Sequence, residues 1–320
     1  MPIGPLVATT DNVVAVPVVS FTPQTLLSMS DAPSQEMAAN VSGDSNETRE
    51  REESGESGQQ PSTMNWAMRE RASRTAGGAG EGTSDVAVLI PAAGAGTRME
   101  SDTRKQFLKL GGESLLVCTL RAFERCEAVG HLVVAVPRRE VYSVSDRLQA
   151  AQLRKLTAVV EGGATRQDSV RNALRAVPKS VRYTLVHDGV RPFIDIGRIS
   201  AVVDAARAVG AASLAVPVAD TLRRGSEADD GATMFGATVD RTGLFRMQTP
   251  QGFRRDWLEA AHRQARQDGA IATDDVELVQ RLGHPVAYVE GSAYNVKVTT
   301  PTDWALATAL WDTWAKDQTA

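Results

Sequence analysis

From residue 86 onward, short apolar runs alternate with segments whose apolar residues recur every three or four positions. Runs of four or five apolar residues rich in β-branched types are typical of strands buried on both faces of a sheet. Such runs occupy 86–90 and 132–136, and similar runs with one Thr or Ser each occupy 156–160, 183–186 and 213–216. The helical spacing occupies 115–123, 170–177 and 199–206. This alternation predicts right-handed βαβ units, and therefore an α/β fold with a mostly parallel twisted sheet and helices on both faces.

The alternation stops between Pro217 and Gln251. A turn rich in Gly and Asp, at 225–231, separates two segments that can pair as a hairpin, so we expect an excursion from the main sheet. Beyond it the pattern predicts helices around 257–267 and 274–282, β segments near 286–289 and 295–298, and a last helix. Its one-sided Trp304, Ala307, Trp311 and Trp314 indicate core packing rather than a binding cage.

The first 84 residues have a different composition. Residues 40–84 are rich in Ser, Gly, Glu, Arg and Gln, which cannot bury enough apolar surface to offset the entropy of ordering, so we expect disorder. Residues 12–28 are more apolar and can form a docking segment or an extended tail, and we favour the tail. The first 20 residues lack a basic segment and include Asp11, which disfavours a signal peptide.

Composition narrows the class of protein. The chain has 320 residues, 42% of them hydrophobic and 23% charged, as in ordinary globular proteins. A net charge of −4 gives no global electrostatic basis for binding nucleic acid, and no apolar run approaches the roughly 20 residues that span a bilayer. Only two cysteines occur, Cys118 and Cys126, which favours a reducing, cytoplasmic location.

The loop after the first strand carries the main chemical pattern, PAAGAGTRM at 91–99, with Lys105 six residues further on. Gly94 and Gly96 can take positive φ and let a ligand approach main-chain N–H groups, and Arg98 and Lys105 add positive charge. This combination suits a nucleoside triphosphate. An ordinary strand-to-helix turn with two surface cations fits equally well, and the loop alone does not decide between them.

A second strand end supplies a carboxylate. Asp188 stands where a buried strand opens into solvent, between His187 and Gly189, with Arg191 nearby. Mg²⁺ is usually held by one or two carboxylates plus substrate phosphates, so we favour a metal ligand over a turn cap for Asp188. For His187 we expect a structural hydrogen bond to the backbone rather than a general base.

Other strand ends add weaker candidates. Two glycines at 162–163 lead into a helix start with Arg166 and Ser169, which can contact an anion or a base, although a capped helix start explains this segment alone. Lys297 lies in an apolar β segment, where a lone lysine usually points to solvent. Asp220 and Thr221 follow the 213–216 strand at the same rim, and Thr273 precedes a helix where capping would explain it.

The combination of strand ends disfavours a nicotinamide-binding fold and a P-loop NTPase. The chain has no GxGxxG turn after a strand, no GxxxxGK[ST] loop, no nucleophile elbow and no Cys or His cluster for a metal. A basic site for phosphates with one Mg²⁺ remains, which indicates phosphoryl or nucleotidyl transfer driven by positioning and charge stabilisation.

From Asp85 to about Lys316 the chain resembles the 2-C-methyl-D-erythritol 4-phosphate cytidylyltransferase family. The resemblance rests on PAAGAGTRM (91–99), KQF (105–107), EGGATRQDSV (161–170), VHDGVRPF (186–193), PVADT (217–221), TVDRTGLFRMQTPQGF (238–253), ATDD (272–275) and NVKVT (295–299). It implies a Rossmann-like nucleotidyltransferase domain over 85–316 with a protruding β-arm at about 218–247, between an extension (1–84) and a short tail (317–320). It also implies a homodimer formed through the arm.

The family's reaction joins CTP and methylerythritol phosphate, with Mg²⁺, to give 4-diphosphocytidyl-2-C-methylerythritol and pyrophosphate. By resemblance, Arg98, Lys105 and Lys297 stabilise the pentacoordinate transition state, and Asp188 holds the metal. The residues expected to contact cytidine or triphosphate are Ala92, Ala93, Gly94, Gly96, Gly163, Arg166, Ser169, Asp188 and Gly189. Those expected to contact methylerythritol phosphate are Asp220, Thr221, Thr273 and, from the arm of the partner subunit, Arg241. No general base is needed, because the attacking group is already a phosphate oxyanion.

Two positions depart from the family pattern. Arg104 stands where the family often has proline, which predicts a more mobile loop, and Ala164 replaces a commonly acidic residue, which weakens the case for a ribose contact there. Two other functions share some of these features: a ribitol-5-phosphate cytidylyltransferase, and a non-catalytic nucleotide-binding module. The ATDD, TVDR and PVADT segments favour methylerythritol phosphate over ribitol phosphate. Arg98, Lys105, Asp188 and Lys297 together favour an enzyme over a binding module.

Overall fold

A computed structural model of the chain describes residues 84–94, 104–228 and 231–317. Its main sheet has seven strands in the order β11-β7-β10-β6-β1-β4-β5, and β10 is antiparallel to both of its neighbours while the other adjacent pairs are parallel. The strands are β1 (Val86–Pro91), β4 (His131–Val136), β5 (Leu156–Glu161), β6 (Tyr183–Val186), β7 (Ala211–Pro217), β10 (Phe245–Arg254) and β11 (Ala287–Glu290). The mostly parallel α/β sheet predicted from the alternating pattern is therefore confirmed.

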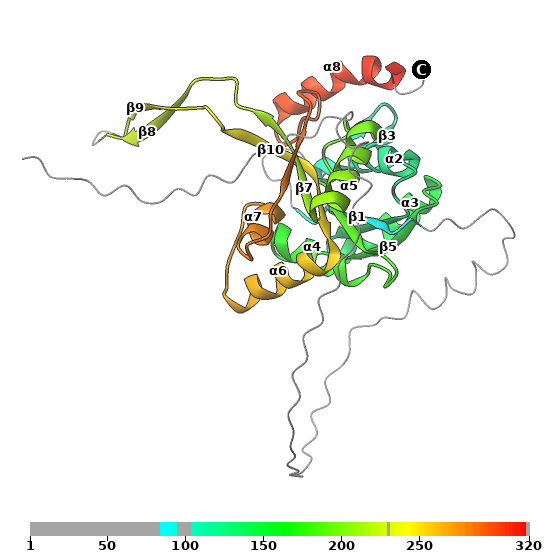
Figure 1. Cartoon of the computed structure of the whole chain (residues 1–320). Helices are drawn as coiled ribbons and strands as arrows, with labels where there is room; N and C mark the ends of the chain where they lie inside the picture. The colour runs from blue at the N-terminus through cyan, green and yellow to red at the C-terminus, as the bar shows by residue number, and fades with distance from the viewer. Residues whose placement is uncertain (1–83, 95–103, 229–230, 318–320) are drawn as a thin grey trace, which may run out of the picture. The chain divides into compact units, whose positions relative to one another are not determined.

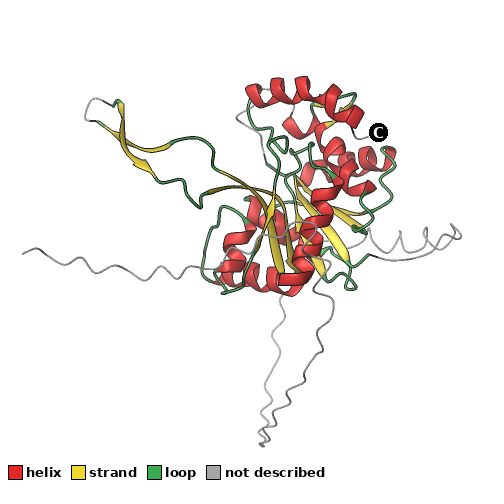
Figure 2. Cartoon of the chain, turned by 45° about the horizontal axis from the view of Figure 1, so that its top comes forward, coloured by secondary structure: helices red, strands yellow, loops and turns green. Residues whose placement is uncertain are grey.

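Helices cover both faces of this sheet (Figures 1 and 2). They are α2 (Leu115–Arg125), α3 (Val141–Ala150), α4 (Arg166–Arg175), α5 (Ile196–Val209), α6 (Arg255–Gln267), α7 (Asp275–Gln280) and α8 (Pro301–Asp317), with short 3-10 turns η3 (Lys105–Phe107) and η4 (Arg138–Glu140). The sequence pattern predicted all of the α-helices except α3, in which only Val144 and Leu148 are buried. Among the described residues, no helix is long and apolar enough to cross a bilayer.

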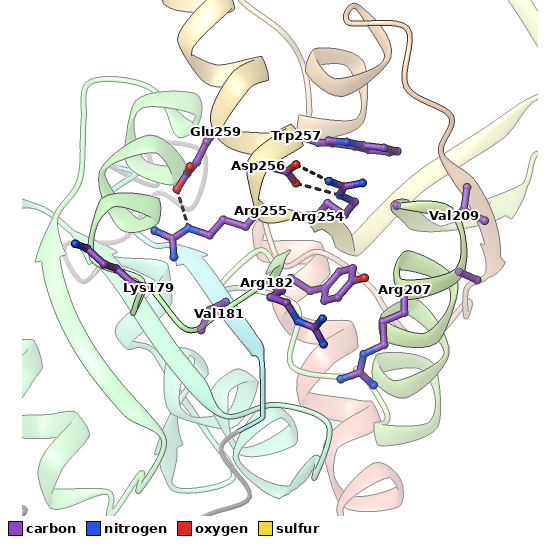
Figure 3. A pocket seen from close by; sticks show the side chains of 13 residues that line it. Lys179, Val181, Arg182, Arg207, Val209, Arg254, Arg255, Asp256, Trp257 and Glu259 are labelled. Atoms are coloured by element: carbon purple, nitrogen blue, oxygen red, sulfur yellow. Dashed lines mark hydrogen bonds and ion pairs between the residues drawn. The ribbon is translucent and has the colours of Figure 1, made fainter. Parts of the chain in front are cut away.

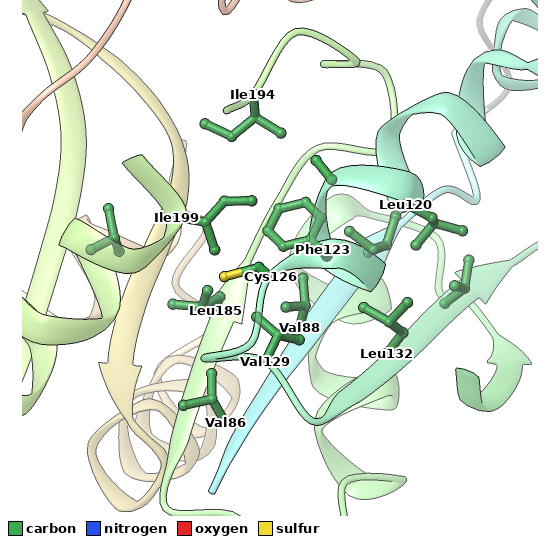
Figure 4. Packing of buried hydrophobic residues seen from close by; sticks show 14 of the residues in the cluster. Val86, Val88, Leu120, Phe123, Cys126, Val129, Leu132, Leu185, Ile194 and Ile199 are labelled. Atoms are coloured by element: carbon green, nitrogen blue, oxygen red, sulfur yellow. The ribbon is translucent and has the colours of Figure 1, made fainter. Parts of the chain in front are cut away.

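The two faces of β1 show why its residues are apolar throughout. Val86, Val88 and Ile90 pack into one cluster with α2, α3 and α5, part of which is shown in Figure 4. Ala87 and Leu89 pack into a second cluster with α4, α6 and α7. Burial of a strand on both faces requires an uninterrupted apolar run, which is the pattern that the sequence shows.

Strand β10 corrects the expectation that the whole of 217–251 leaves the main sheet. Its residues 245–254 run between β6 and β7, although the strand is polar and contains Pro250. Proline is tolerated in a sheet at a bulge, and the pairing with β7 shifts register between Met247 and Gln251. The polar side chains are buried because they bond to each other and to neighbouring loops, so hydrophobic periodicity does not reveal this strand.

The predicted hairpin is present as β8 (Leu222–Glu227) paired with β9 (Thr233–Val239), and it extends away from the sheet (Figures 1 and 2). The turn is shorter than the predicted 225–231, because Gly225 pairs with Phe235 within the ladder. A second small hairpin joins β2 (Lys109–Leu110) to β3 (Glu113–Ser114).

The predicted β segment at 295–298 is wrong, because no strand is formed there. The segment is instead fixed by single contacts, among them a backbone bond from Val298 N to Val190 O at 3.0 Å. The last helix agrees with the prediction: Trp311 and Trp314 make edge contacts with buried Phe193, as expected of core packing.

Candidate functional site

Asp188 is the centre of a compact group of charges at the carboxyl end of β6. Its carboxylate contacts Lys297 Nζ at 2.9 Å, and Arg166 Nε and Arg191 Nε at 3.3 Å each. The Asp188 side chain is only 9% exposed. Asp188, Arg166 and Lys297 were predicted as site residues from separate parts of the chain, and the fold brings Arg166 and Lys297 into contact with Asp188.

The surroundings of Asp188 keep it ionised. Burial alone would raise the pKa of its carboxyl group, but the charges of Lys297, Arg166 and Arg191 outweigh burial and hold the pKa well below its usual range. Counted with the buried Asp275 that also contacts Arg166, the five groups carry three positive and two negative charges. This net positive charge suits a phosphate-bearing ligand.

Lys297 pairs with Asp188, although its side chain is 40% exposed. A polar network fixes the chain that precedes it: Gln248 Nε2 donates to Ser292 O at 2.8 Å, and Gln248 Oε1 accepts from Ser292 N at 3.2 Å. Asn295, fully buried, donates from Nδ2 to Thr249 O at 2.8 Å. Since the segment has no neighbouring strand in the described structure, these side chains supply the bonds that a ladder would have made.

Arg191 joins this segment to the carboxylate. Its Nε contacts Asp188, and its Nη1 donates to Asn295 O at 2.7 Å. The sequence analysis noted Arg191 only as a nearby cation and gave it no role. Its place in the motif VHDGVRPF was the available indication, because it lies three residues after Asp188 where the chain turns.

His187 has the structural role that was expected for it. The ring is fully buried, with Nε2 3.2 Å from Arg191 O and Nδ1 3.1 Å from the Thr249 hydroxyl. Burial lowers the pKa of the imidazole to about 4, so the ring is neutral at ordinary pH. Both ring nitrogens are engaged, so the ring orients the strand end.

The glycine turn at 162–163 is fixed by the helix that follows it. Ser169, at the start of α4, accepts from Gly163 N at 3.1 Å and donates to Thr165 O at 3.0 Å. Thr165 and Asp168 form a reciprocal capping box, so the capped helix start considered from the sequence is also present. A Cβ on Gly163 would collide with Asp168, so glycine is required here by packing.

The glycines near β1 and β6 differ in their surroundings. Gly94 is exposed, its φ is not in the left-handed range, and the space where a Cβ would stand is open, which leaves room for a ligand. Ala92 is buried and Ala93 is partly buried. Gly189 is also buried, and a Cβ there would press on Ile90 at 3.0 Å, so packing explains it without a ligand. The contact predicted between Gly189 and a ligand stays a prediction.

The predicted cations of the loop are only partly described. Gly96 and Arg98 lie outside the described residues. Lys105 is partly exposed and begins η3, and the next residue, Gln106, is buried and donates to Ala92 O at 3.0 Å. Gln106 was not singled out from the sequence, although it stands in the KQF motif. It ties the turn that carries Lys105 to the end of β1.

Arg104, which departs from the family pattern, has defined partners. Its Nε contacts Glu140 of η4 at 2.9 Å, and Nη1 lies 3.5 Å from Gly94 O. These contacts link both sides of the 95–103 segment to η4. The expected extra mobility of the loop stays a prediction, and so does the effect of the exposed Ala164 on a ribose contact.

The residues predicted to bind the second substrate lie at two other places. Asp220 and Thr221 are exposed at the base of the arm, and Arg241 is hydrogen-bonded to Ala219 O beside them. Thr273 is exposed and donates to Glu277, while Asp274 caps α7. The arrangement brings Arg241 next to Asp220, and places Thr273 two residues from the buried Asp275.

A hollow lies at the other end of the sheet, near the start of β6 (Figure 3). It is basic, but its arginines have acidic partners: Arg254 pairs with Asp256 at 2.6 Å, and Arg255 pairs with Glu259 at 2.7 Å. No residue that the sequence analysis selected lines it. The candidate site is therefore the Asp188 group rather than this hollow.

Comparisons with known proteins identify the family of this chain. The family model described as 2-C-methyl-D-erythritol 4-phosphate cytidylyltransferase matches residues 86–312. A protein of that name from Salinibacter ruber is 60% identical over 229 residues, which cover 72% of this chain and 94% of the relative. Another from Pelotomaculum thermopropionicum is 46% identical over 226 residues, covering 70% and 93%.

A solved structure shows the same fold. The crystal structure of 2-C-methyl-D-erythritol 4-phosphate cytidylyltransferase from Thermus thermophilus is 39% identical to the chain, has a TM-score of 0.57, and is matched over 70% of this chain and 96% of its own. The family model spans Asp188, Arg166 and Lys297, which the fold joins into one ionic group. The chain belongs to the 2-C-methyl-D-erythritol 4-phosphate cytidylyltransferase family.

Proposed function

We propose that this chain transfers the cytidylyl group of CTP to 2-C-methyl-D-erythritol 4-phosphate in isoprenoid biosynthesis. A phosphate oxygen of the acceptor attacks the α-phosphorus of CTP, the bond from that phosphorus to the β-phosphate oxygen breaks, and pyrophosphate leaves. The observation that carries the proposal is the ionic group around Asp188, in which three cations from separate segments converge on one carboxylate. Membership of the family supports the choice of substrates.

Charge stabilisation accounts for the rate in this proposal. The attacking oxyanion needs no base, and the neutral, fully engaged His187 ring agrees with that. Negative charge gathers on the oxygens of the α-phosphorus in the transition state, and fixed cations stabilise it more strongly in a partly buried site than in water. Lys297 would act from the acceptor side, while Lys105 and Arg98 would act on the triphosphate.

Mg²⁺ is the cofactor in this proposal, and the donor set fits it. Among the residues that the structure describes, no group of three His, Cys, Asp or Glu side chains could hold a metal alone. Mg²⁺ keeps several waters and commonly takes one carboxylate together with substrate phosphates, and Asp188 supplies one ionised carboxylate. The ion would neutralise triphosphate charge as a Lewis acid.

We also propose a homodimer formed through the arm. On β9, the Phe235 side chain is 82% exposed and that of Met234 is 57% exposed. Large apolar side chains clustered on a protruding hairpin are typical of a surface covered by another chain. This arrangement would let Arg241 serve the substrate of the partner subunit. A cytoplasmic location accords with the free thiols of Cys118 and Cys126.

A pyrophosphate-release assay with CTP and Mg²⁺ tests the function. We expect turnover with methylerythritol phosphate and at most trace turnover with ribitol 5-phosphate as the acceptor. Turnover only with ribitol 5-phosphate would overturn the substrate. Tight binding of CTP with no release of pyrophosphate in the presence of either acceptor would instead support a non-catalytic nucleotide-binding module.

A further inference from the structure

Arg166 is held from two sides, and the two contacts are unequal. Its Nη1 lies 2.7 Å from Asp275 Oδ2, whereas its Nε lies 3.3 Å from Asp188 Oδ1. Asp275 is 1% exposed, and the Arg166 side chain is 28% exposed. The shorter and more deeply buried contact is therefore the one with Asp275, a residue that the sequence analysis placed only in a helix start.

Asp275 is itself fixed at a junction of helices. It is the first residue of α7, its N–H donates to Gln251 Oε1 at 3.3 Å, and its Oδ1 accepts from His262 Nε2 of α6 at 2.9 Å. His262 is 2% exposed. Burial alone would raise the pKa of the Asp275 carboxyl group, but Arg166 and His262 outweigh it and keep the carboxyl ionised. Arg166 thus has a buried, ionised counter-ion.

We infer that Asp275 is a positioning residue that holds the Arg166 guanidinium beside the glycine turn and Asp188, ready for CTP. This inference rests on the proposed function, because it takes CTP to be the ligand. In the proposed function Asp188 would also hold Mg²⁺, and a cation there would compete with Arg166 for the carboxylate and weaken the 3.3 Å contact. Asp275 would then keep Arg166 in place. Without it, Asp188 would be the only carboxylate contacting Arg166 among the described residues, and the guanidinium would compete with the metal for it.

A double-mutant cycle tests whether Asp275 acts through Arg166. The full chain and its Asp275→Asn, Arg166→Ala and doubly substituted variants are titrated with CTP in Mg²⁺ by calorimetry. We expect Asp275→Asn to weaken CTP binding about tenfold in the wild-type background, and less than twofold when Arg166 is alanine. An equal loss in both backgrounds would overturn the inference, because Asp275 would then act without Arg166.

His262→Leu is the matched control. It removes the other contact of the same carboxylate, at the same helix junction, without touching Arg166. If Asp275 only held the helices together, Asp275→Asn and His262→Leu would weaken CTP binding equally. Equal effects would therefore count against a role of Asp275 in positioning Arg166. If thermal unfolding shows that the Asp275→Asn variant is not folded, Asp275→Glu replaces it in the cycle. The glutamate keeps the charge and displaces the carboxylate by one methylene.

A second measurement needs no CTP. The Arg166 Nε–H signal in ¹⁵N-detected NMR spectra of the ligand-free protein is expected to be sharp and slowly exchanging in the wild type and in His262→Leu, and broadened in Asp275→Asn. An unchanged signal in Asp275→Asn would overturn the inference. A wild-type protein that shows no CTP binding would contradict the proposed function, while this signal would still decide whether Asp275 holds Arg166.

Discussion

Asp188 and Asp85 lie at opposite ends of the same sheet, and each has arginine partners. Asp85 precedes β1 and contacts Arg182 and Arg207 at 2.8 Å each. Asp188 is 9% exposed and Asp85 is 18% exposed. The arginines of Asp85 are 76% and 41% exposed, whereas the partners of Asp188 are 11% (Arg191), 28% (Arg166) and 40% (Lys297) exposed. In both cases, burial alone would raise the carboxyl pKa and the cations lower it.

The two carboxylates therefore differ in burial as well as in the number of their ion pairs. Exposed pairs contribute roughly 0–1 kcal/mol to stability because water and salt screen them. Buried charges must be compensated, so removing one partner costs several kcal/mol and the remaining charges act strongly on a ligand. The carboxyl end of the sheet therefore holds the more deeply buried carboxylate, while Asp85 at the amino end joins Arg182 and Arg207 of α5 near the surface.

The largest expected effect is on turnover at the carboxyl end. Lys297→Ala and Lys105→Ala should each lower kcat about 10²- to 10³-fold without unfolding the protein, because each removes a fixed cation from the transition state. Steady-state pyrophosphate release measures kcat, and circular dichroism checks folding. Lys179→Ala, at the rim of the basic hollow, is the control and should leave kcat unchanged. Near-normal kcat in both site variants would refute the mechanism.

The next effect is on stability. Asp188→Asn leaves three cations facing each other and should lower the free energy of unfolding by about 3 kcal/mol in metal-free buffer. Asp85→Asn should lower the free energy of unfolding by less than about 1 kcal/mol, and high salt should abolish this small loss. Urea denaturation followed by tryptophan fluorescence compares the two variants. Equal losses would remove the distinction between the two ends.

The dependence of stability on pH sharpens the same comparison. Cations hold the pKa of Asp188 below its ordinary value in the folded protein, so the unfolded chain binds more protons as the solution is acidified. The stabilisation is complete above about pH 5 and is lost as pH falls. We therefore expect the stability difference between the wild type and Asp188→Asn to shrink between about pH 5 and pH 3, measured by urea denaturation. A difference that stays constant with pH would show that the contribution of Asp188 to stability does not depend on its charge.

The smallest expected effect comes from removing the N-terminal extension. The described chain begins at Ser84, beside Asp85 at the amino end of the sheet, away from Asp188. Deletion of residues 1–80 should leave kcat and KM within about twofold of the wild type, as measured by pyrophosphate release. A large fall in kcat would give the extension a part in the reaction.

Most of the fold was predictable, because the parallel strands have runs that are wholly apolar or contain a single Ser or Thr. Strand β10 was not predictable in this way, since Gln248, Thr249 and Gln251 are buried by bonding to other polar groups. Hydrophobic periodicity records burial in an apolar environment and carries no information on polar groups that satisfy one another. Polar groups of this network also fix the segment at 295–298, which was predicted as a strand and forms none.

The sequence by itself determined the α/β class, the arm and the residue types of the site, because these follow from periodicity and from motifs of contiguous residues. Only the tertiary structure decided which charges meet. Arg166, Asp275 and Lys297 lie 22 to 109 residues from Asp188 along the chain, and the contacts that join them run through Arg166 and Asp188. Local sequence sets backbone preference, whereas an ionic contact depends on distance in space, which the packing of helices on the sheet establishes.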